Sequence, residues 1–260
     1  MNVSAGASRS AFSVATLFNR QWWWTTLLVL AAMAVMVRLG FWQLDRLAQR
    51  RARNAEIVQQ LSLPPLLLSG EALPDAPARL KDRRATARGR FDFSHQVALK
   101  LQNWQNRPGI HLVAPLVIDG GDKAVLVDRG WLPEAEAAAE NWSKFDEPGP
   151  VEVSGFIQLS QTLPPGREGA GVAQLKPGPQ LAWYRLDIEA IQAQMPYELL
   201  PVYLLQSPGA GDNAALPYRL EPDFDLSEGP HLGYAIQWYL FALILAAGYV
   251  RYVRKTFSKA

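Results

Sequence analysis

The sequence predicts a membrane protein of the α+β class, in which two transmembrane helices flank an antiparallel, β-rich domain that is barrel-like or sandwich-like. Three observations support this class. An apolar segment lies near each end of the chain, all 24 acidic residues lie between these segments, and the central region changes to period-two patterning. The expected parts are a tail at 1–20, a helix at 21–42, the β-rich domain at 43–230, a helix at 231–252 and a tail at 253–260.

The amino-acid composition excludes several kinds of functional site. The chain has 260 residues, of which 49% are hydrophobic, and it contains no cysteine. The lack of thiols excludes disulfides, thiolate metal sites and redox-active cysteine pairs, and the scattered positions of the four methionines argue against a copper carrier. Acidic residues outnumber basic ones in the central domain, whereas only basic charges occur outside it. Nucleic acid is therefore not an expected partner.

The first apolar segment, Trp22 to Phe41, is long enough to span a bilayer and is interrupted only by Arg38. Tryptophans at 22–24 and aromatic residues at 41 and 42 would lie about 30 Å apart, at the two interfaces of the hydrocarbon layer. A cleavable signal peptide is the alternative, because Ala32-Met33-Ala34 resembles a processing site. The continuation of apolar residues through Trp42 favours a retained helix.

Beyond Trp42 no helix breaker occurs before Pro64, so this helix is expected to continue for several turns outside the bilayer. Arg46, Arg50 and Arg53 would share one face of the extension. They would contact lipid phosphates or a partner, or form a solvated charged face.

The central region has the pattern of strands joined by hairpins. In Arg84 to Phe91, Arg or Thr alternates with Ala, Gly or Phe, which predicts a strand with an arginine ladder on one face. Turn signals at 106–109 and 119–122 separate further strands. These are expected at 94–101, 110–118, 124–128, 151–159 and 202–205, with short helices at 134–142 and 187–194, a Pro- and Gly-rich loop at 163–179 and a linker at 208–230.

The second apolar segment, 232–250, carries no charge, and basic residues follow it, as in a transmembrane helix with a basic stop. At its start, His231, Tyr234 and Trp238 share one helix face. An imidazole beside two aromatic rings could hold a flat apolar ring, and imidazole is a common axial ligand of haem iron. The alternative is an interfacial aromatic belt with a histidine that caps the helix.

The charge pattern predicts the orientation in an inner membrane. Arg251, Arg254 and Lys255 follow the second helix and acidic residues precede it, which favours a cytoplasmic C-terminus. The arginines that follow the first helix favour the opposite orientation, but a loop of about 190 residues is largely exempt from this charge rule. Both termini are therefore expected in the cytoplasm and the β-rich domain in the periplasm.

Sequence motifs of enzymes are missing. The chain has no GxSxG, HExxH, P-loop or GxGxxG match, and its three histidines are too scattered to form a metal-binding motif. We therefore expect a protein that is not an enzyme.

Five phrases follow one another along the chain. They are Leu39-Gly40-Phe41-Trp42-Gln43-Leu44-x-Arg46, Arg88-Gly89-x-Phe91, Arg107-Pro108-Gly109, Val127-Asp128-Arg129-Gly130-Trp131-x-Pro133 and His231-Leu232-x-Tyr234-Ala235-x-x-Trp238. In order, spacing and two-helix frame they resemble the Surfeit-locus-1 family of cytochrome c oxidase assembly proteins over residues 39–250. The family pattern usually has an asparagine two residues before the histidine, where this chain has Gly229.

The resemblance implies an assembly factor, or chaperone, of respiratory chain biogenesis that serves an aa3-type haem-copper oxidase. It would bind haem a transiently and aid its insertion into subunit I, with subunit I, haem a synthase and membrane lipids as partners. His231 would contact the haem iron, Tyr234 and Trp238 would stack on the ring, and Trp42 and Gln43 would form another wall. Arg129 or the arginine ladder from Arg84 would meet the propionates or form structural ion pairs. A purely structural scaffold for oxidase subunits, without haem binding, is the alternative.

Overall fold

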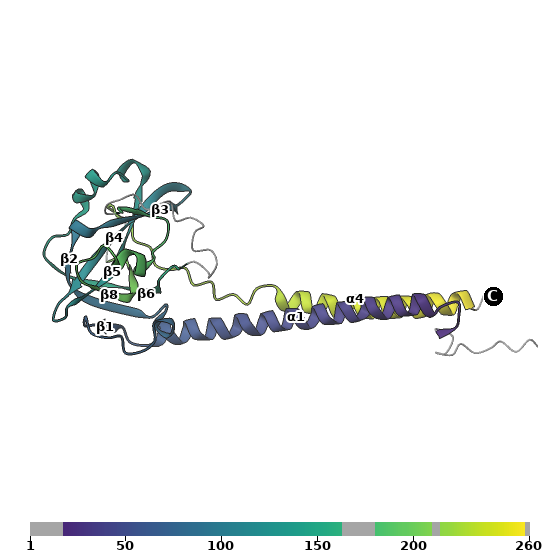
Figure 1. Ribbon diagram of the computed structural model, residues 1–260. Helices are drawn as coiled ribbons and strands as arrows, with labels where there is room; N and C mark the ends of the chain where they lie inside the picture. The colour runs from purple at the N-terminus through teal and green to yellow at the C-terminus, as the bar shows by residue number, and fades with distance from the viewer. Residues whose placement is uncertain (1–17, 163–179, 210–213, 258–260) are drawn as a thin grey trace, which may run out of the picture. The chain divides into compact units, whose positions relative to one another are not determined.

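The computed structural model describes residues 18–162, 180–209 and 214–257. The chain forms two compact units, one made of its two ends, up to Ala55 and from Leu226, and the other of Glu56–Asp225. Figure 1 shows long helices in the first unit and a β-rich second unit. The loop expected at 163–179 and most of the tail expected at 1–20 lie outside the described residues.

Two helices form the first unit: α1 (Trp23–Ser62) has 40 residues and α4 (His231–Phe257) has 27. Helix α1 ends two residues before Pro64, where the sequence first offers a helix breaker. Each helix contains an apolar stretch long enough to cross a membrane, and only 11% of each stretch is buried. These helices therefore differ from the buried core helix of a soluble protein, and their exposed apolar surface is consistent with membrane association.

The helices pack side by side and antiparallel along one seam (Figure 1). At Gly40, a β-carbon would lie 2.5 Å from Cε1 of Tyr239, so only glycine lets this ring approach α1. Nearer the N-terminus of α1, the Thr26 and Tyr249 hydroxyls are 2.6 Å apart. The buried seam positions, which recur at multiples of seven on α1, are Thr26, Gly40 and Leu47 on α1 and Ala235, Ala242 and Val253 on α4.

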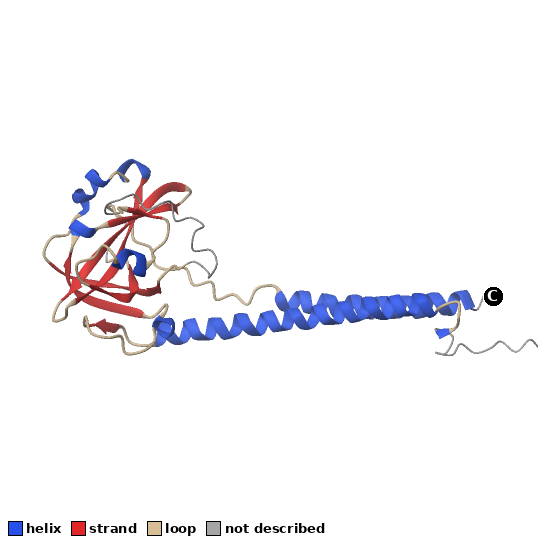
Figure 2. Cartoon of the chain, viewed as in Figure 1, coloured by secondary structure: helices blue, strands red, loops and turns tan. Residues whose placement is uncertain are grey.

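In the described part of the second unit, eight strands form one sheet in the order β1-β2-β6-β8-β5-β4-β3-β7. Figure 2 shows the strands of this unit in red. An additional pairing between β2 and β4 closes β2, β6, β8, β5 and β4 into a five-stranded barrel, so of the two predicted architectures the barrel is confirmed. The strands are β1 (Leu66–Leu68), β2 (Arg84–Phe91), β3 (Val97–Trp104), β4 (Arg107–Ile118), β5 (Lys123–Pro133), β6 (Pro150–Leu159), β7 (Ala182–Trp183) and β8 (Glu198–Gln206).

The sheet is not purely antiparallel, so that part of the prediction is wrong. Strand β8 pairs antiparallel with β6 and parallel with β5, and the pairings β1–β2 and β3–β7 are also parallel. A parallel pair requires a crossover rather than a hairpin, and here β8 is inserted between two strands that precede it in the sequence. Local period-two patterning carries no information about such a crossover.

Short helices cover the barrel. They are α2 (Pro77–Leu80), the 3-10 helices η2 (Phe93–His95), η3 (Glu134–Glu136) and η4 (Ala139–Phe145), and α3 (Ile188–Gln192). The carboxylate of Asp187 caps α3 by accepting from the backbone N–H of Ala190 at 3.3 Å. The single helix expected at 134–142 is wrong, because this stretch forms the separate turns η3 and η4, and Trp142 is buried against the barrel.

The core has an inner and an outer layer. Val125 and Val127 of β5 point into the barrel, whereas the alternate residues Ala124 and Leu126 point outward and pack with Ile191 of α3. Both faces of β5 are therefore buried, and so is the Asp-Arg-Gly-Trp sequence that follows on the same strand.

Candidate functional site

Helix α4 begins at the histidine singled out by the sequence. The first helical hydrogen bond joins the N–H of Tyr234 to the carbonyl of Pro230 at 3.1 Å. The preceding Gly229 has φ +68°, in the left-handed region, which glycine and asparagine adopt most readily. Glycine at this position therefore meets a backbone requirement that asparagine could also meet.

His231 is held across the seam by Gln43. Its Nδ1 lies 2.9 Å from Oε1 of Gln43, and the histidine remains partly exposed. The structure thus brings together two of the predicted site residues, which are 188 positions apart in the sequence.

The extension of α1 fixes the segment that leads to this histidine. Arg51 donates two hydrogen bonds to the carboxylate of Glu228, at 2.7 and 2.8 Å. One turn away, Nδ2 of Asn54 donates to the carbonyl of Leu226 at 2.6 Å, and Nε of Arg50 donates to the carbonyl of Ser227 at 3.0 Å. Of the three arginines predicted to share a face, Arg50 helps to hold this segment, together with Arg51 and Asn54. The lipid or partner contact expected of that face stays a prediction.

The other predicted site residues of this unit have exposed or half-buried rings. Tyr234 is 47% exposed and Trp42 is 44% exposed, and the guanidinium of Arg46 lies 5.8 Å from the centre of the Trp42 ring. Trp238 is half-buried and meets Phe241 edge to face at 6.1 Å. The start of α4 thus combines an imidazole with accessible aromatic surface.

Arg129 belongs to the β-rich unit and is fully buried. Its guanidinium donates to Oε1 of Gln96 at 2.9 Å, to Glu147 at 3.1 Å and to the carbonyl of Phe145. The rings of Phe91 and Phe93 lie 5.1 and 4.9 Å from it. Burial lowers the pKa of Arg129, and the carboxylate of Glu147 opposes this shift. Both terminal nitrogens of the buried guanidinium are therefore paired with protein acceptors, which fits the structural alternative. The contact with a propionate stays a prediction.

The arginine ladder lies on the exposed face of β2, as its alternation predicts. Arg88 pairs with Glu152, its cross-strand neighbour, at 2.7 Å. Arg84 stacks over its own cross-strand neighbour, Phe156, at 5.4 Å. Both contacts fit the structural alternative, and a contact of the ladder with propionates stays a prediction.

The Asp-Arg-Gly-Trp sequence on β5 fastens a segment of the linker to the barrel. Trp131 and Tyr218 exchange two backbone hydrogen bonds, at 2.8 and 2.9 Å. At Gly130, where φ is +121°, a β-carbon would lie 2.6 Å from the Tyr218 carbonyl oxygen, so only glycine allows this approach. Asp128 accepts from Gly130 N at 3.1 Å and contacts Nδ1 of His111 at 2.7 Å.

The Arg-Pro-Gly sequence meets the same place from β4. A β-carbon at Gly109 would lie 2.6 Å from the indole nitrogen of Trp131, and Arg107 stacks over Trp104 and Trp131 at 5.0 and 5.5 Å. Tyr218 completes the aromatic cluster, at 4.4 Å from Trp104. These two sequence phrases are therefore explained by anchoring of the linker, a role that sequence reasoning missed.

A family model described as the SURF1 family matches residues 30–243, which include most of α1, the whole β-rich unit and the first half of α4. This chain belongs to the SURF1 family. The resemblance recognised in the sequence is confirmed, and membership implies a role in cytochrome oxidase assembly in general. Known members of the family are assembly factors rather than enzymes.

Relatives from distant organisms align over most of the chain. An uncharacterized SURF1-like protein of Mycobacterium tuberculosis is 27% identical over 220 residues, covering 81% of this chain and 76% of the relative. A SURF1-like protein of Rickettsia bellii is 24% identical and covers 89% of this chain and 91% of the relative. Surfeit locus protein 1 of Mus musculus is 25% identical and covers 88% and 76% respectively.

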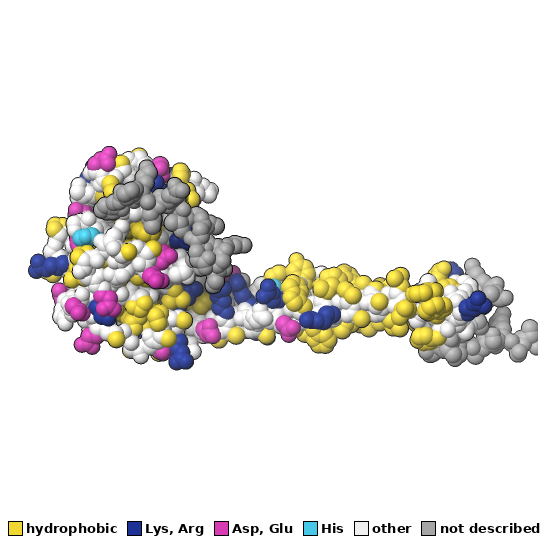
Figure 3. Space-filling model, in the orientation of Figure 1, with side chains coloured by type: hydrophobic (Ala, Val, Ile, Leu, Met, Phe, Trp, Pro, Cys, Tyr) yellow, Lys and Arg dark blue, Asp and Glu magenta, His cyan; other side chains and the backbone are white. Residues whose placement is uncertain are grey.

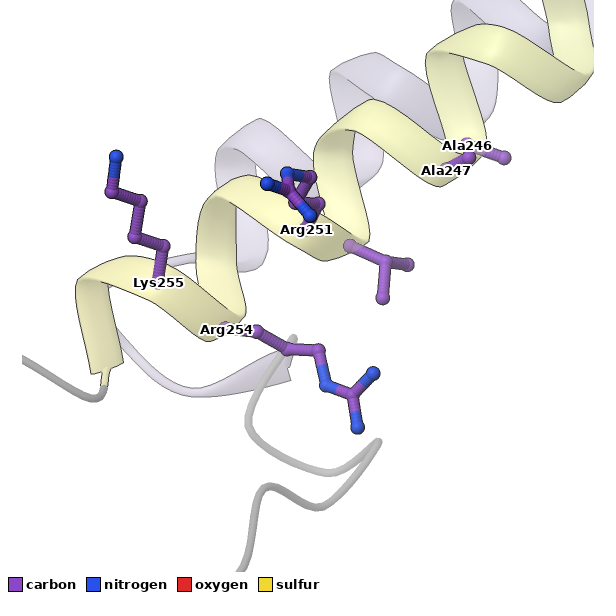
Figure 4. A pocket seen from close by; sticks show the side chains of 6 residues that line it. Ala246, Ala247, Arg251, Arg254 and Lys255 are labelled. Carbon is purple, nitrogen blue, oxygen red and sulfur yellow. The ribbon is translucent and has the colours of Figure 1, made fainter.

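A pocket of about 700 Å³ lies at the other end of α4 in this SURF1 family member. Ala246, Ala247 and Val250 line it together with three basic side chains, and Figure 4 shows these projecting from the last turns of the helix: Arg251, Arg254 and Lys255. Twenty residues at 1.5 Å each separate it from His231, a distance of about 30 Å, so it is not part of the histidine site. It is the basic end of the apolar stretch.

Within the described ranges, no group of three or more His, Asp or Glu side chains gathers in a way that could hold a metal ion. At the start of α4, the imidazole of His231 is a side chain that could serve as an iron ligand.

Proposed function

We propose that this chain is an inner-membrane assembly factor that binds haem a at His231 and aids its insertion into subunit I of an aa3-type cytochrome c oxidase. The observation that carries the proposal is the anchored imidazole. One nitrogen of His231 is paired with Gln43, and a β-carbon at position 229 would lie 3.6 Å from the other, where this chain has only glycine. The second nitrogen is free of a covering side chain at that position.

The surroundings fit a haem. A macrocycle needs apolar surface to cover it and an axial ligand for its iron. Exposed Tyr234 and Trp42 and half-buried Trp238 supply ring surface on the same unit as His231. When bound, the haem would supply the redox-active iron that the oxidase requires; the protein supplies one ligand and an apolar face. A single ligand at an accessible helix end suits a cofactor that is passed onward, because release then breaks one coordination bond.

The helices support insertion into a bilayer with both termini in the cytoplasm. Figure 3 shows hydrophobic side chains over the helical part between charged ends. The basic end of α4, with Arg251 and Lys255, would face the cytoplasm, and the segment holding Glu228 would lie on the periplasmic side together with the β-rich unit.

The test is haem retention by the full-length, detergent-purified protein from cells that make haem a. The wild type should show a Soret band and His231→Ala should lose most of it, since truncation at a helix end costs little packing. His95→Ala is the matched control, because His95 is also partly exposed and hydrogen-bonded, at 2.7 Å to Asp92. His111 is less suitable as a control because it is only partly exposed and is paired with the buried Asp128. Wild-type protein without a Soret band would favour the scaffold alternative.

A second measurement separates a carrier from an enzyme. Cells that lack the chain should assemble less oxidase and contain less haem a in their membranes, while haem a synthesis in extracts stays normal. Co-purification of subunit I and haem a synthase with the tagged chain would support the proposed partners. Loss of the synthetic activity itself would mean that the chain acts in making the cofactor rather than in delivering it.

A further inference from the structure

Gln43 lies on the seam between the helices, with interhelical contacts on both sides. One turn before it, Gly40 receives the ring of Tyr239, and two turns after it, Arg51 binds Glu228. The amide of Gln43 and the imidazole of His231 are thus held opposite one another by contacts that do not involve either side chain. Their 2.9 Å separation follows from the packing of the two helices.

This pairing can take two forms with opposite consequences. If the amide oxygen faces Nδ1, it accepts the Nδ1 proton, and the neutral ring offers an unprotonated Nε2. If the amide nitrogen faced Nδ1, it would donate to an unprotonated Nδ1 and the proton would sit on Nε2. Only the first form leaves a nitrogen that can bind a metal, because a metal ligand must present a lone pair.

We infer that Gln43 is a positioning residue, whose side-chain oxygen accepts from Nδ1 of His231 and so fixes the tautomer in which Nε2 is the free ligand atom. The arrangement in the structure has Oε1 toward Nδ1. Nε2 lies on the side of Gly229, which has no side chain to cover it, and His231 is partly exposed. From the sequence, Gln43 was expected to form a wall of the haem site. In the structure it contacts Nδ1 of His231, the ring nitrogen that would not bind the iron.

The consequence for metal binding rests on the proposed function, whereas the tautomer does not. Partners that orient a ligating histidine typically contribute about 10–100-fold to metal affinity. Loss of the Gln43 oxygen should therefore weaken haem binding by a factor in this range. It should leave the pairing of the helices intact, since that depends on Gly40, Tyr239 and the contacts of Arg51.

The tautomer can be measured without haem, by ¹⁵N NMR of the full-length apoprotein labelled at histidine nitrogens, at a pH where His231 is neutral. His231→Ala assigns the signals. The wild type and Gln43→Glu, which can only accept, should show a protonated Nδ1 and an unprotonated Nε2. Gln43→Leu should shift the proton toward Nε2, and Gln43→Lys, which can only donate, should shift it further. Gln49→Leu, at an exposed position of α1, is the matched control and should behave as the wild type.

Haem affinity provides the second arm. It should fall about 10–100-fold in Gln43→Leu and Gln43→Lys and be preserved in Gln43→Glu. An unchanged His231 tautomer in Gln43→Leu, with helix content equal to the wild type, would overturn the inference even if haem binds. Conversely, the expected tautomers in a protein that never binds haem would support the positioning role and defeat the proposed function.

Discussion

Gly229 adopts a left-handed conformation, with φ +68°, two residues before His231, and a β-carbon there would lie 3.4 Å from Cδ2 of that histidine. The distance is an ordinary contact, so space does not forbid a side chain at this position. The backbone conformation is the constraint, and it sets the direction in which α4 begins.

The effect of a substitution at position 229 on stability should therefore depend on how readily the new residue adopts the left-handed conformation. Gly229→Asn should leave the free energy of unfolding almost unchanged, whereas Gly229→Val should lower it by about 1–2 kcal/mol. Chemical denaturation of the detergent-solubilised protein, followed by circular dichroism, measures both. Equal destabilisation by Asn and Val would show that steric contact with His231, and not the backbone angle, governs this position.

The pair of His111 and Asp128 should make stability depend on pH. Burial lowers the pKa of His111, but attraction and a hydrogen bond to the Asp128 carboxylate outweigh it, so the pKa is raised. A raised pKa means that the folded state binds the proton more tightly than the unfolded state. The stabilisation is complete below the unfolded pKa of about 6.5 and is lost as the pH rises through the folded value.

Unfolding free energies measured from about 1.5 pH units below the unfolded pKa to about 2.5 units above it test this prediction. The wild type should lose stability relative to His111→Gln as the pH rises, with a slope of at most about 1.4 kcal/mol per pH unit. In Asp128→Asn, burial alone acts on the histidine, so the sign of the pH dependence should reverse. Parallel curves for wild type and His111→Gln would show that the histidine does not titrate with folding.

Arg129 should be a stability residue and not a haem contact. Removing a buried charge leaves its partners unpaired, so Arg129→Ala should lower the free energy of unfolding by about 3–5 kcal/mol. The exposed Arg88 also pairs with a glutamate, and Arg88→Ala should cost no more than about 0.5 kcal/mol. Haem retention per folded molecule should be unchanged in both variants. Selective loss of haem from folded Arg129→Ala would instead show that Arg129 belongs to the haem-binding site.

An exposed face made one strand predictable in its full length. Strand β2, Arg84–Phe91, has arginines outside and small residues inside, and its predicted bounds match the structure. Strand β5 runs from Lys123 to Pro133, whereas only 124–128 was predicted, because both of its faces are buried and Asp128-Arg129-Gly130 has the composition of a turn. Strands β1 and β7 have three and two residues, too few to show a period.

The site was predictable in its histidine but not in its supporting contacts. The uncharged helix with His231 at its start is a local signal, whereas the hydrogen bond to Gln43 depends on the pairing of two helices separated by the whole β-rich unit. For Arg129 the resemblance left two roles open, a contact with a propionate or a structural ion pair. Its burial was not predictable, because it results from Gln96, Glu147 and two phenylalanines that neighbour it only in the fold.

The proposed topology predicts the behaviour of reporter fusions. Alkaline phosphatase folds only after export, so a fusion at Lys259 should be inactive and an insertion at Gly166 active. Green fluorescent protein at Lys259 should fluoresce and serves as the control for expression. An active phosphatase at Lys259 would reverse the orientation, since the basic residues from Arg251 onward would then lie outside the cytoplasm.

Substitutions at two glycines with positive φ can distinguish the cost of a strained backbone from the cost of a steric clash. Gly130 has φ +121° and Gly149 has φ +106°; a β-carbon meets the Tyr218 carbonyl oxygen at 2.6 Å in the first case and nothing within 4 Å in the second. Alanine at either position should cost about 1–3 kcal/mol through its backbone conformation. Gly130→Ala should cost about 1–3 kcal/mol more, because the linker backbone must move away from β5.

Hydrogen exchange locates the difference between these two variants. The amides of Trp131 and Tyr218 donate to each other's carbonyls at 2.8 and 2.9 Å, so both should exchange slowly in the wild type. In Gly130→Ala, both amides should exchange faster, while amides in the barrel, such as those of Leu126 and Val153, stay protected. In Gly149→Ala, the amides of Trp131 and Tyr218 should keep their protection. If Gly130→Ala leaves these two amides protected, the close approach at Gly130 does not hold the linker, and the Asp-Arg-Gly-Trp sequence must act through Asp128 and Arg129 alone.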